Sequence, residues 1–532
     1  MEGTFWAFLP AIIAIVLALV TKQVYVSLFV GIFVGAMMYT GGDPLNALFT
    51  MYQVMSEKIG SNAPILVFLV ILGILVILMQ KSGGAKAYGE WAGKKIKSKG
   101  GALGATAGLG CLIFVDDYFN CLTVGSVMRP VADKFKVSRS KLAYIIDATA
   151  APICIIAPIS SWAAAVAGEL EGDGLVMFMS TIPFNVYALL TIAMVFAFCF
   201  LKLDFGKMKR NEMLAEKTGD VFAGVPTESS EAETIVSNPK GKVRDLIIPV
   251  IILIICCIGG MLYTGFFYNW DTGLIGKELQ SANVIEAFSN CDAGTSLAIG
   301  STIALVLIML YYMIGKVVSF KEITSSFTEG FKAMVPAILI LTFAWSISGI
   351  IGAKGGYLDA RAFVQTNLEG GNFPTFLFPA IFFVLAGLIA FATGTSWGTF
   401  GVLVPIAVAI LGGSGTMAIL TVSATLGGAV FGDHVSPISD TTILASAGAQ
   451  CDHVEHVNTQ LPYASVVAGI SIVAYLVAGL CVGLGSVLAC VIMWVVTLAL
   501  FAGVIFVIKS FEKKKGAVVE SEACEQKCAE EE

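Results

Sequence analysis

The chain has 532 residues, of which 57% are hydrophobic and only 13% are charged, and its formal net charge is −6. This composition excludes an ordinary soluble domain, in which about 25% of the residues are charged. It also excludes nucleic-acid binding, because the basic residues lie beside apolar segments and form no binding stripe. Many of the twelve cysteines lie inside apolar segments, which indicates membrane-compatible side chains rather than a disulfide framework.

Long apolar segments recur along the whole chain, and each can cross a hydrocarbon core of about 30 Å. The predicted spans are 5–21, 24–40, 64–80, 141–168 and 175–201 in the first half, 246–268, 296–315, 335–353, 416–448 and 461–484 in the second, and a final span over 486–508. We therefore expect an all-α integral membrane protein with about 11 transmembrane helices.

The basic residues set the predicted orientation. Lys and Arg cluster at 81–99, 129–141, 202–217, 316–332 and 509–515. The positive-inside rule places all five clusters in the cytoplasm, with the N-terminus outside and the C-terminus inside. The segments left outside are 41–62, 169–174, 269–294 and 354–373. Since residues 101–128 have a basic cluster on both sides, we expect a re-entrant hairpin there, turning near Asp116 and Asp117.

The second half is predicted to repeat this order with the opposite orientation. Residues 374–411 form a second re-entrant hairpin that turns near Thr393–Trp397. Matching halves of opposite orientation are typical of an inverted-repeat transporter with broken helices. The predicted division is a first membrane repeat over 1–203 with its hairpin at 101–129, a flexible cytoplasmic linker over 204–244, a second repeat over 245–485 with its hairpin at 374–411, a final helix over 486–509 and a cytoplasmic tail over 510–532.

The tripeptide Pro-Ile-Ser occurs at 158–160 and again at 437–439, once in each half. Each copy interrupts an apolar segment and follows another segment that polar residues break, at 114–120 and at 392–398. Unwound backbone at membrane depth is tolerated only where it lines a site. Paired interruptions in corresponding positions therefore indicate the binding site of a transporter.

Acidic residues at membrane depth are costly, so they are functional candidates. Asp116, Asn120 and Thr123 have the spacing of one helical face, Asp117 lies on the same turn, and Asp147 lies in the next span. The other candidates are Asp433, His434, Ser436, Ser439, Asp440 and Thr441 around Pro437, and Thr393, Thr395, Ser396 and Thr399 in the second hairpin.

These residue types suit the exchange of a cation for a proton. A hard cation prefers several oxygen ligands, and Asp116, Asp433 and Asp440 are the predicted ligands of a transported sodium ion. Burial raises the pKa of a carboxyl group, so that it can hold either a proton or a cation. Structural alternatives stay open: Asp116 and Asp117 could cap a hairpin turn, a histidine could only bond its neighbours, and hydroxyls could bond their own helix.

Two other functions are not expected. The segment Cys451–His456 holds four potential metal ligands but lacks the spacing of a structural zinc site, so we expect a solvated cytoplasmic loop. The spans contain no nucleophile–base pair and no cofactor loop, which argues against an enzyme and against any cofactor beyond the transported ions.

The run Phe-Gly-Asp-His-Val-Ser-Pro-Ile-Ser-Asp-Thr-Thr at 431–442, with Gly-Thr-Ser-Trp-Gly-Thr at 394–399 and Asp-Asp-Tyr at 116–118, resembles the NhaC family of sodium/proton antiporters. The resemblance implies gradient-driven transport in a bacterial inner membrane, and the broader group implies a homodimer. It carries over Asp433, His434, Ser436, Asp440 and Thr441 from the run, and Thr395, Ser396 and Trp397 from the hairpin.

The same family includes exchangers of malate and lactate. A sodium- or proton-coupled transporter of an organic acid or an amino acid therefore stays open as the alternative. The spans contain no cluster of Arg or Lys that would mark a carboxylate-binding site, which favours a bare cation.

Overall fold

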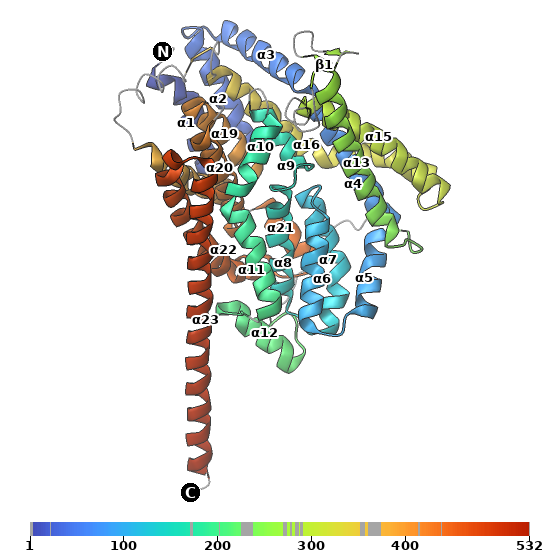
Figure 1. The fold of residues 1–532 in the computed structure, drawn as a ribbon, viewed down its shortest axis with the longest axis vertical. Coiled ribbons are helices and arrows are strands. Elements are labelled where there is room, and N and C mark those ends of the chain that lie inside the picture. Colours follow the sequence, from blue (N-terminus) through green and yellow to red (C-terminus); the bar gives the residue numbers. More distant parts are fainter. Residues whose placement is uncertain are drawn as a thin grey trace.

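The computed structural model describes residues 4–21, 23–170, 174–201, 203–224, 238–269, 274–276, 279–281, 287, 291–351, 357–359, 374–412, 415–437 and 439–530. These residues are helical almost throughout (Figure 1), apart from the two-residue strands β1 (Tyr268–Asn269) and β2 (Leu274–Ile275). Eight helices are long and apolar enough to span a membrane, or up to ten if each bent pair counts as one span. The predicted all-α, multi-span membrane protein is confirmed.

The chain begins with η1 (Phe5–Phe8), α1 (Leu9–Thr21), α2 (Val24–Tyr39) and α3 (Pro44–Ser61), and α3 bends by 119° from α2. The sequence analysis placed 41–62 outside the membrane and assigned no span to it, and in the structure most of this segment forms α3. Asp43 accepts hydrogen bonds from the backbone N–H groups of Leu45 and Asn46, and Pro44 occupies the first helical position. This cap starts a helix that lies across one end of the molecule (Figure 1).

Four helices pack together on one side of the molecule: α4 (Ala63–Ser82), α13 (Arg244–Phe267), α15 (Ala293–Ile314) and α16 (Phe320–Ile351) (Figure 1). Helices α4 and α16 cross at Gly73 and Gly330, where a Cβ atom on Gly73 would lie 2.4 Å from the Gly330 carbonyl oxygen. Only glycines allow two backbones to approach so closely.

The first half then forms a hairpin and a broken helix. After α5 (Gly84–Lys95), the hairpin consists of α6 (Lys99–Leu112) and α7 (Asp117–Lys134). The broken helix consists of α8 (Arg139–Cys154) and α9 (Ser161–Glu169), and it is followed by α10 (Gly174–Thr181), η2 (Ile182–Phe184) and α11 (Val186–Leu201). The 14 residues of α6 extend only about 21 Å, which is too short for a full crossing.

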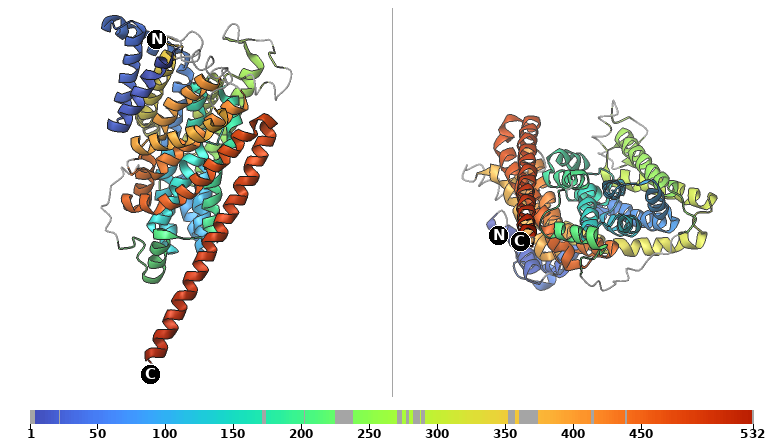
Figure 2. Two further views of the ribbon diagram at one scale, coloured as in Figure 1. Left: turned by 90° about the vertical axis from the view of Figure 1, so that its left-hand side faces the viewer. Right: turned by 90° about the horizontal axis from the view of Figure 1, so that it is seen from below.

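The second half has the same order of elements. Its hairpin comprises η3 (Thr375–Leu377), α18 (Phe378–Thr393) and α19 (Ser396–Leu411), and its broken helix comprises α20 (Thr416–Val435) and α21 (Asp440–Ala449). The chain ends with α22 (His453–Cys481), η4 (Val482–Leu484) and α23 (Ser486–Glu530). Helix α23 extends far beyond the rest of the molecule (Figures 1 and 2).

Part of the predicted flexible linker is folded. Residues Gly206–Thr218 form α12, which contacts α8 and α22. Glu212 is buried, lies 3.0 Å from the Lys99 ammonium group and accepts a hydrogen bond from the Ser138 N–H. The polar composition of this segment therefore reflects a network of charged contacts, and α12 lies at the end of the molecule opposite α3 (Figure 1). Residues 225–237 of the linker lie outside the described residues.

Candidate functional site

The two Pro-Ile-Ser segments break helices by the same local chemistry. Proline has no N–H to donate, so it ends the first helix. The serine then caps the second helix: Ser160 Oγ accepts from the Ala163 N–H at 3.0 Å, and Ser439 Oγ accepts from the Thr442 N–H at 3.3 Å. The repeated tripeptide thus ends one helix and begins the next.

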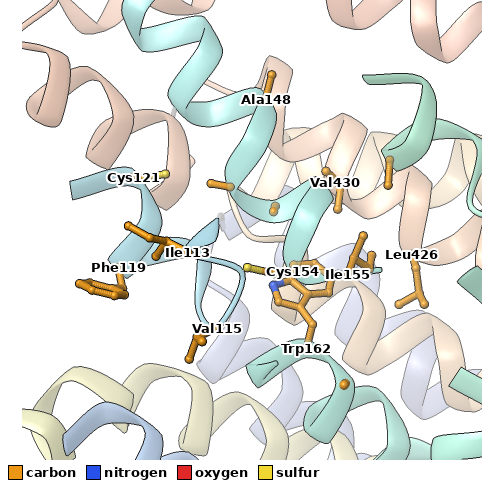
Figure 3. Close-up of a cluster of buried hydrophobic side chains, with 14 of the residues drawn as sticks. Ile113, Val115, Phe119, Cys121, Ala148, Cys154, Ile155, Trp162, Leu426 and Val430 are labelled. Atoms are coloured by element: carbon orange, nitrogen blue, oxygen red, sulfur yellow. The ribbon is translucent and has the colours of Figure 1, made fainter. Parts of the chain in front are cut away.

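Each break is attached to the hairpin that precedes it. The Ser161 N–H donates to the Val115 carbonyl at 2.9 Å, which joins the tip of the α6–α7 hairpin to the start of α9. Figure 3 shows Val115 and Trp162 beside each other at this junction, with Cys154 and Ile155 at the break. In the second half, Ser436 Oγ donates to the Phe391 carbonyl at 2.7 Å, near the end of α18.

The first hairpin buries two adjacent carboxylates. Asp116 caps α7 and accepts from the Phe119 N–H at 2.9 Å, while Asp117 accepts from Trp162 Nε1 at 3.1 Å. Asn120 Nδ2 donates to the carbonyls of residues 110 and 113, which ties α7 to the end of α6. Asp116 does cap a helix, as the structural alternative proposed, but it is 2% exposed and not bathed in water.

The second break contains Asp433, the last acidic residue of α20. Its Oδ2 accepts from Thr441 Oγ1 at 2.7 Å, and its Oδ1 has no hydrogen-bond partner in the described part of the chain. Ser439 Oγ lies 3.2 Å from the Thr441 hydroxyl. Asp440 is the first residue of α21, and its side chain lies outside the described side chains.

Asp147 lies at full burial in α8 and is surrounded by α20 and α22. Its Oδ2 accepts from Gln460 Nε2 at 2.5 Å and lies 3.4 Å from His456 Nε2. The same Gln460 amide donates to the His434 carbonyl at 2.7 Å, and His434 Nδ1 lies 3.0 Å from the Tyr187 hydroxyl. Gln460 therefore links this carboxylate to the backbone of the second break, and His456 lies beside it.

The sequence analysis missed His456, Gln460, Tyr187 and Trp162 as members of this region. It assigned residues 451–456 to a solvated loop, which is wrong: α22 begins at His453, and His456 is completely buried. The spacing of His456 and Gln460, four residues apart, would have placed both on one helical face. Within the described residues, no three His, Cys, Asp or Glu side chains are grouped closely enough to hold a metal ion.

The structure brings four of the predicted acidic residues into one electrostatic group, which we call the aspartate cluster: Asp116, Asp117, Asp147 and Asp433. Asp116 and Asp117 are adjacent in the chain, Gln460 links Asp147 to the carbonyl of His434, which follows Asp433, and the charges of Asp117 and Asp147 are close enough to act on Asp433. The close crossing of α7 and α21 at Gly125 and Gly448 holds the two halves together beside it.

Buried lysine and arginine side chains do not neutralise this cluster. Lys81, Arg139 and Lys141 are the buried lysine and arginine residues in the described part of the chain. Lys81 pairs with Glu329, Arg139 with Asp133, and Lys141 with Asp204. Each of these pairs is made with an acid outside the aspartate cluster.

The second hairpin offers fewer side-chain oxygens for binding an ion than predicted. Thr393 Oγ1 and Thr399 Oγ1 each donate to a carbonyl of their own helix, and Thr395 Oγ caps α19. These hydroxyls therefore bond their own helix, which was the structural alternative given in the sequence analysis. Ser396 is buried beside them, and Trp397 packs at a tilted angle against Trp162 of α9 with ring centroids 5.7 Å apart. The hairpin therefore reaches the first half through aromatic rings.

Comparison with known proteins shows which family this chain matches. The model of the Na+/H+ antiporter family matches residues 167–480. An uncharacterized protein of Haemophilus influenzae is 39% identical over 493 residues, covering 89% of this chain and 91% of that protein. The malate-2H(+)/Na(+)-lactate antiporter of Bacillus subtilis is 34% identical over 161 residues, covering 28% and 31%. The arginine/ornithine antiporter ArcD of Halobacterium salinarum is 44% identical over 109 residues, covering 20% and 22%.

Proposed function

This chain belongs to the Na+/H+ antiporter family and is a multi-pass membrane transporter, and we propose that it exchanges sodium ions for protons across a bacterial cytoplasmic membrane. The observation that carries the proposal is the aspartate cluster: four buried carboxylates at the turn of the first hairpin, inside α8 and at the second helix break, without a buried lysine or arginine paired to any of them. Such carboxylates need a proton or a cation to offset the cost of burial.

The proposed binding residues are those that surround the two breaks. They are Asp116, Asp117, Asn120, Asp147, Thr393, Thr395, Ser396, Asp433, His434, Ser436, Ser439, Asp440 and Thr441. Asp116, Asp433 and Asp440 are the proposed sodium ligands. Because three carboxylates are not grouped around one point in the described side chains, hydroxyl and carbonyl oxygens freed at the breaks complete the coordination.

In this mechanism sodium and protons compete for the same carboxylates. A protonated or a sodium-bound cluster carries less net charge than an empty one, so that only the loaded forms cross the apolar interior at low cost. The paired hairpins and breaks supply two related halves that can expose the cluster to either side, as in inverted-repeat transporters. The proposed repeats are 1–203 and 245–485.

The test is ion exchange by purified protein in proteoliposomes that contain a pH-sensitive dye. We expect sodium to release protons from wild-type vesicles without any organic substrate. Asp433→Asn and Asp440→Asn should abolish this release, whereas Asp220→Asn, at an exposed aspartate after α12, should leave it unchanged. Proton movement that requires an added organic compound in the wild type would contradict sodium/proton exchange.

The second candidate is exchange of an organic acid or an amino acid. The names of two matched relatives, a malate/lactate antiporter and an arginine/ornithine antiporter, support it. Among these substrates the aspartate cluster suits a cationic amino acid better than a carboxylate, because opposite charges attract at the low dielectric of the site. In the same vesicles, exchange of arginine or malate, or ion movement that occurs only when one of them is added, would support this candidate.

A further inference from the structure

Glu169, the last residue of α9, is a further buried carboxylate at the end of this helix away from the first helix break. Its side chain is 6% exposed, and neither carboxylate oxygen has a hydrogen-bond partner in the described part of the chain. Burial of an ionised carboxylate without partners is strongly unfavourable. The sequence analysis began an outer segment at residue 169, but in the structure Glu169 still belongs to α9 and is buried among other helices.

The surroundings of Glu169 favour a proton over a metal ion. A Cβ atom on Gly401 of α19 would lie 4.0 Å from Glu169 Oε1, with Ala344 and Ile340 of α16 beside it. The neighbouring Gly168 faces Ile65 of α4 and the ring of Trp345. These neighbours present apolar groups and no cluster of oxygen ligands such as sodium requires. A neutral carboxylic acid is compatible with them.

Two groups are available to stabilise the ionised form. Trp345 Nε1 is buried without a hydrogen-bond partner in the described part of the chain, and it lies 3.3 Å from the Cβ position of Gly168. Lys58 of α3 is the charged side chain that interacts electrostatically with Glu169. An unpaired N–H donor and a nearby ammonium group lower the cost of losing the proton. The same pocket can therefore hold Glu169 in either state.

Helix α9 connects this residue to the aspartate cluster. Trp162, near the start of α9, donates to Asp117, and it lies seven residues, or about 10 Å, from Glu169. The ring of Trp162 also contacts Phe400, which precedes Gly401 in α19. Glu169 thus lies about two helical turns beyond Trp162 along α9, at the end of that helix where Lys58 of α3 acts on it.

We propose that Glu169 is a proton-binding residue that transfers protons between the α3 face of the protein and the aspartate cluster. This inference rests on the proposed sodium/proton exchange. The O–H bond of Glu169 breaks as its proton passes to a carboxylate of the aspartate cluster, and Lys58 and the Trp345 N–H stabilise the Glu169 carboxylate that is left. Glu169 then takes up another proton from the water on the α3 face. No bond other than that to the proton is made or broken.

Two transport modes in proteoliposomes test the proposal. Exchange driven by a pH gradient requires proton transfer, whereas exchange of radioactive sodium for sodium at equal pH on both sides does not. We expect Glu169→Gln to lose the first mode and keep the second. Glu57→Gln, at an exposed glutamate of α3, is the matched control and should keep both. Asp433→Asn should lose both modes, since it removes the central site.

Each other outcome has a defined meaning. Wild-type proton exchange in Glu169→Gln overturns the inference and leaves the proposed function intact. Loss of both modes also overturns it, because Glu169 is then part of the structure or of the sodium site. A wild type that exchanges sodium but moves no protons overturns the proposed function, and this inference with it.

A measurement on the wild-type protein avoids any effect of substitution on folding. Dicyclohexylcarbodiimide reacts with protonated carboxyl groups in apolar surroundings, and mass spectrometry identifies the modified residue. We expect modification of Glu169, decreasing as the pH rises, and none of the exposed Glu57. Absence of modification at every pH tested would show that Glu169 does not bind a proton in this pocket.

Discussion

At the level of single residues, two carboxylates of the aspartate cluster have a hydrogen-bond partner at only one of their two oxygens. Asp433 and Asp147 each accept a hydrogen bond at Oδ2, from Thr441 and Gln460, while the Oδ1 atom of each has no partner in the described structure. Buried polar atoms are normally paired, so open oxygens mark places where a ligand can bind. The donors on Oδ2 orient the carboxylates and leave these oxygens available.

Removal of the Thr441 hydroxyl, which donates a hydrogen bond to Asp433, tests this arrangement. Thr441→Val keeps the side-chain shape but removes the donor to Asp433 Oδ2, and loss of such an orienting bond weakens ion affinity by about 10-fold to 100-fold. We expect a higher sodium concentration for half-maximal proton release in proteoliposomes. Thr425→Val in α20 is the control, because its buried hydroxyl bonds only the Thr421 carbonyl of its own helix. An equal effect of both substitutions would contradict an orienting role for Thr441.

At the level of elements, two kinds of residue position the site. Proline and serine break α8–α9 and α20–α21 beside the aspartates, and glycines allow the elements to approach. A Cβ atom on Gly125 of α7 would lie 2.5 Å from the Gly448 backbone of α21. This crossing brings the first hairpin against the second broken helix, so that carboxylates from both halves interact.

Because of this crossing, alanine substitutions at two glycines of the same hairpin should differ clearly in their effect on the free energy of unfolding. Gly125→Ala should lower the free energy of unfolding by about 1–3 kcal/mol, because the backbones must separate. Gly108→Ala in α6 meets no atom within 4 Å and should be neutral or stabilising by less than about 1 kcal/mol. Thermal unfolding of both variants in detergent measures the difference. Equal melting temperatures would contradict the close crossing.

The folding of α12 also depends on a specific contact. Glu212→Ala removes the buried partner of Lys99 and the acceptor of the Ser138 N–H, so we expect a loss of about 3 kcal/mol. Glu216→Ala removes an exposed partner of the same lysine, and its cost should stay below about 1 kcal/mol. Protease cleavage after residue 218 provides the readout, and it should increase only in Glu212→Ala. Similar cleavage of both variants would show that α12 is not held by this contact.

At the level of the whole molecule, the basic clusters predict an orientation in the membrane. The start of α3 and the end of α12 lie at opposite ends of the molecule (Figure 1), and positive charge should keep the α12 end in the cytoplasm. The C-terminal helix α23 extends from that same end (Figure 2).

Accessibility of single cysteines to a membrane-impermeant maleimide tests this orientation. The substitutions are Ser61→Cys at the end of α3 and Thr218→Cys at the end of α12, both exposed, in a background in which the native cysteines are replaced. We expect labelling of Ser61→Cys in intact cells and of Thr218→Cys only after permeabilisation. The reverse pattern would show that the N-terminus lies inside.

Local rules were sufficient to predict the breaks and the acidic candidates. Long apolar segments, proline and buried aspartates act through their own backbone or through the cost of desolvation, which needs no knowledge of distant residues. The break at Pro158 and the hairpin turn at Asp116 were therefore found, with boundaries shifted by a few residues. The pairing of the two halves as inverted repeats stays a prediction.

The sequence by itself determined that this protein lies in a membrane, that two of its helices are broken, and that aspartates lie at the breaks, because hydrophobicity and backbone chemistry are properties of short segments. Only the tertiary structure decided which groups surround those aspartates. His456 and Gln460 reach Asp147 from 300 residues or more along the chain, and Glu169 becomes buried only because α16 and α19 cover it. Burial and pairing between distant segments depend on packing, which no local pattern encodes.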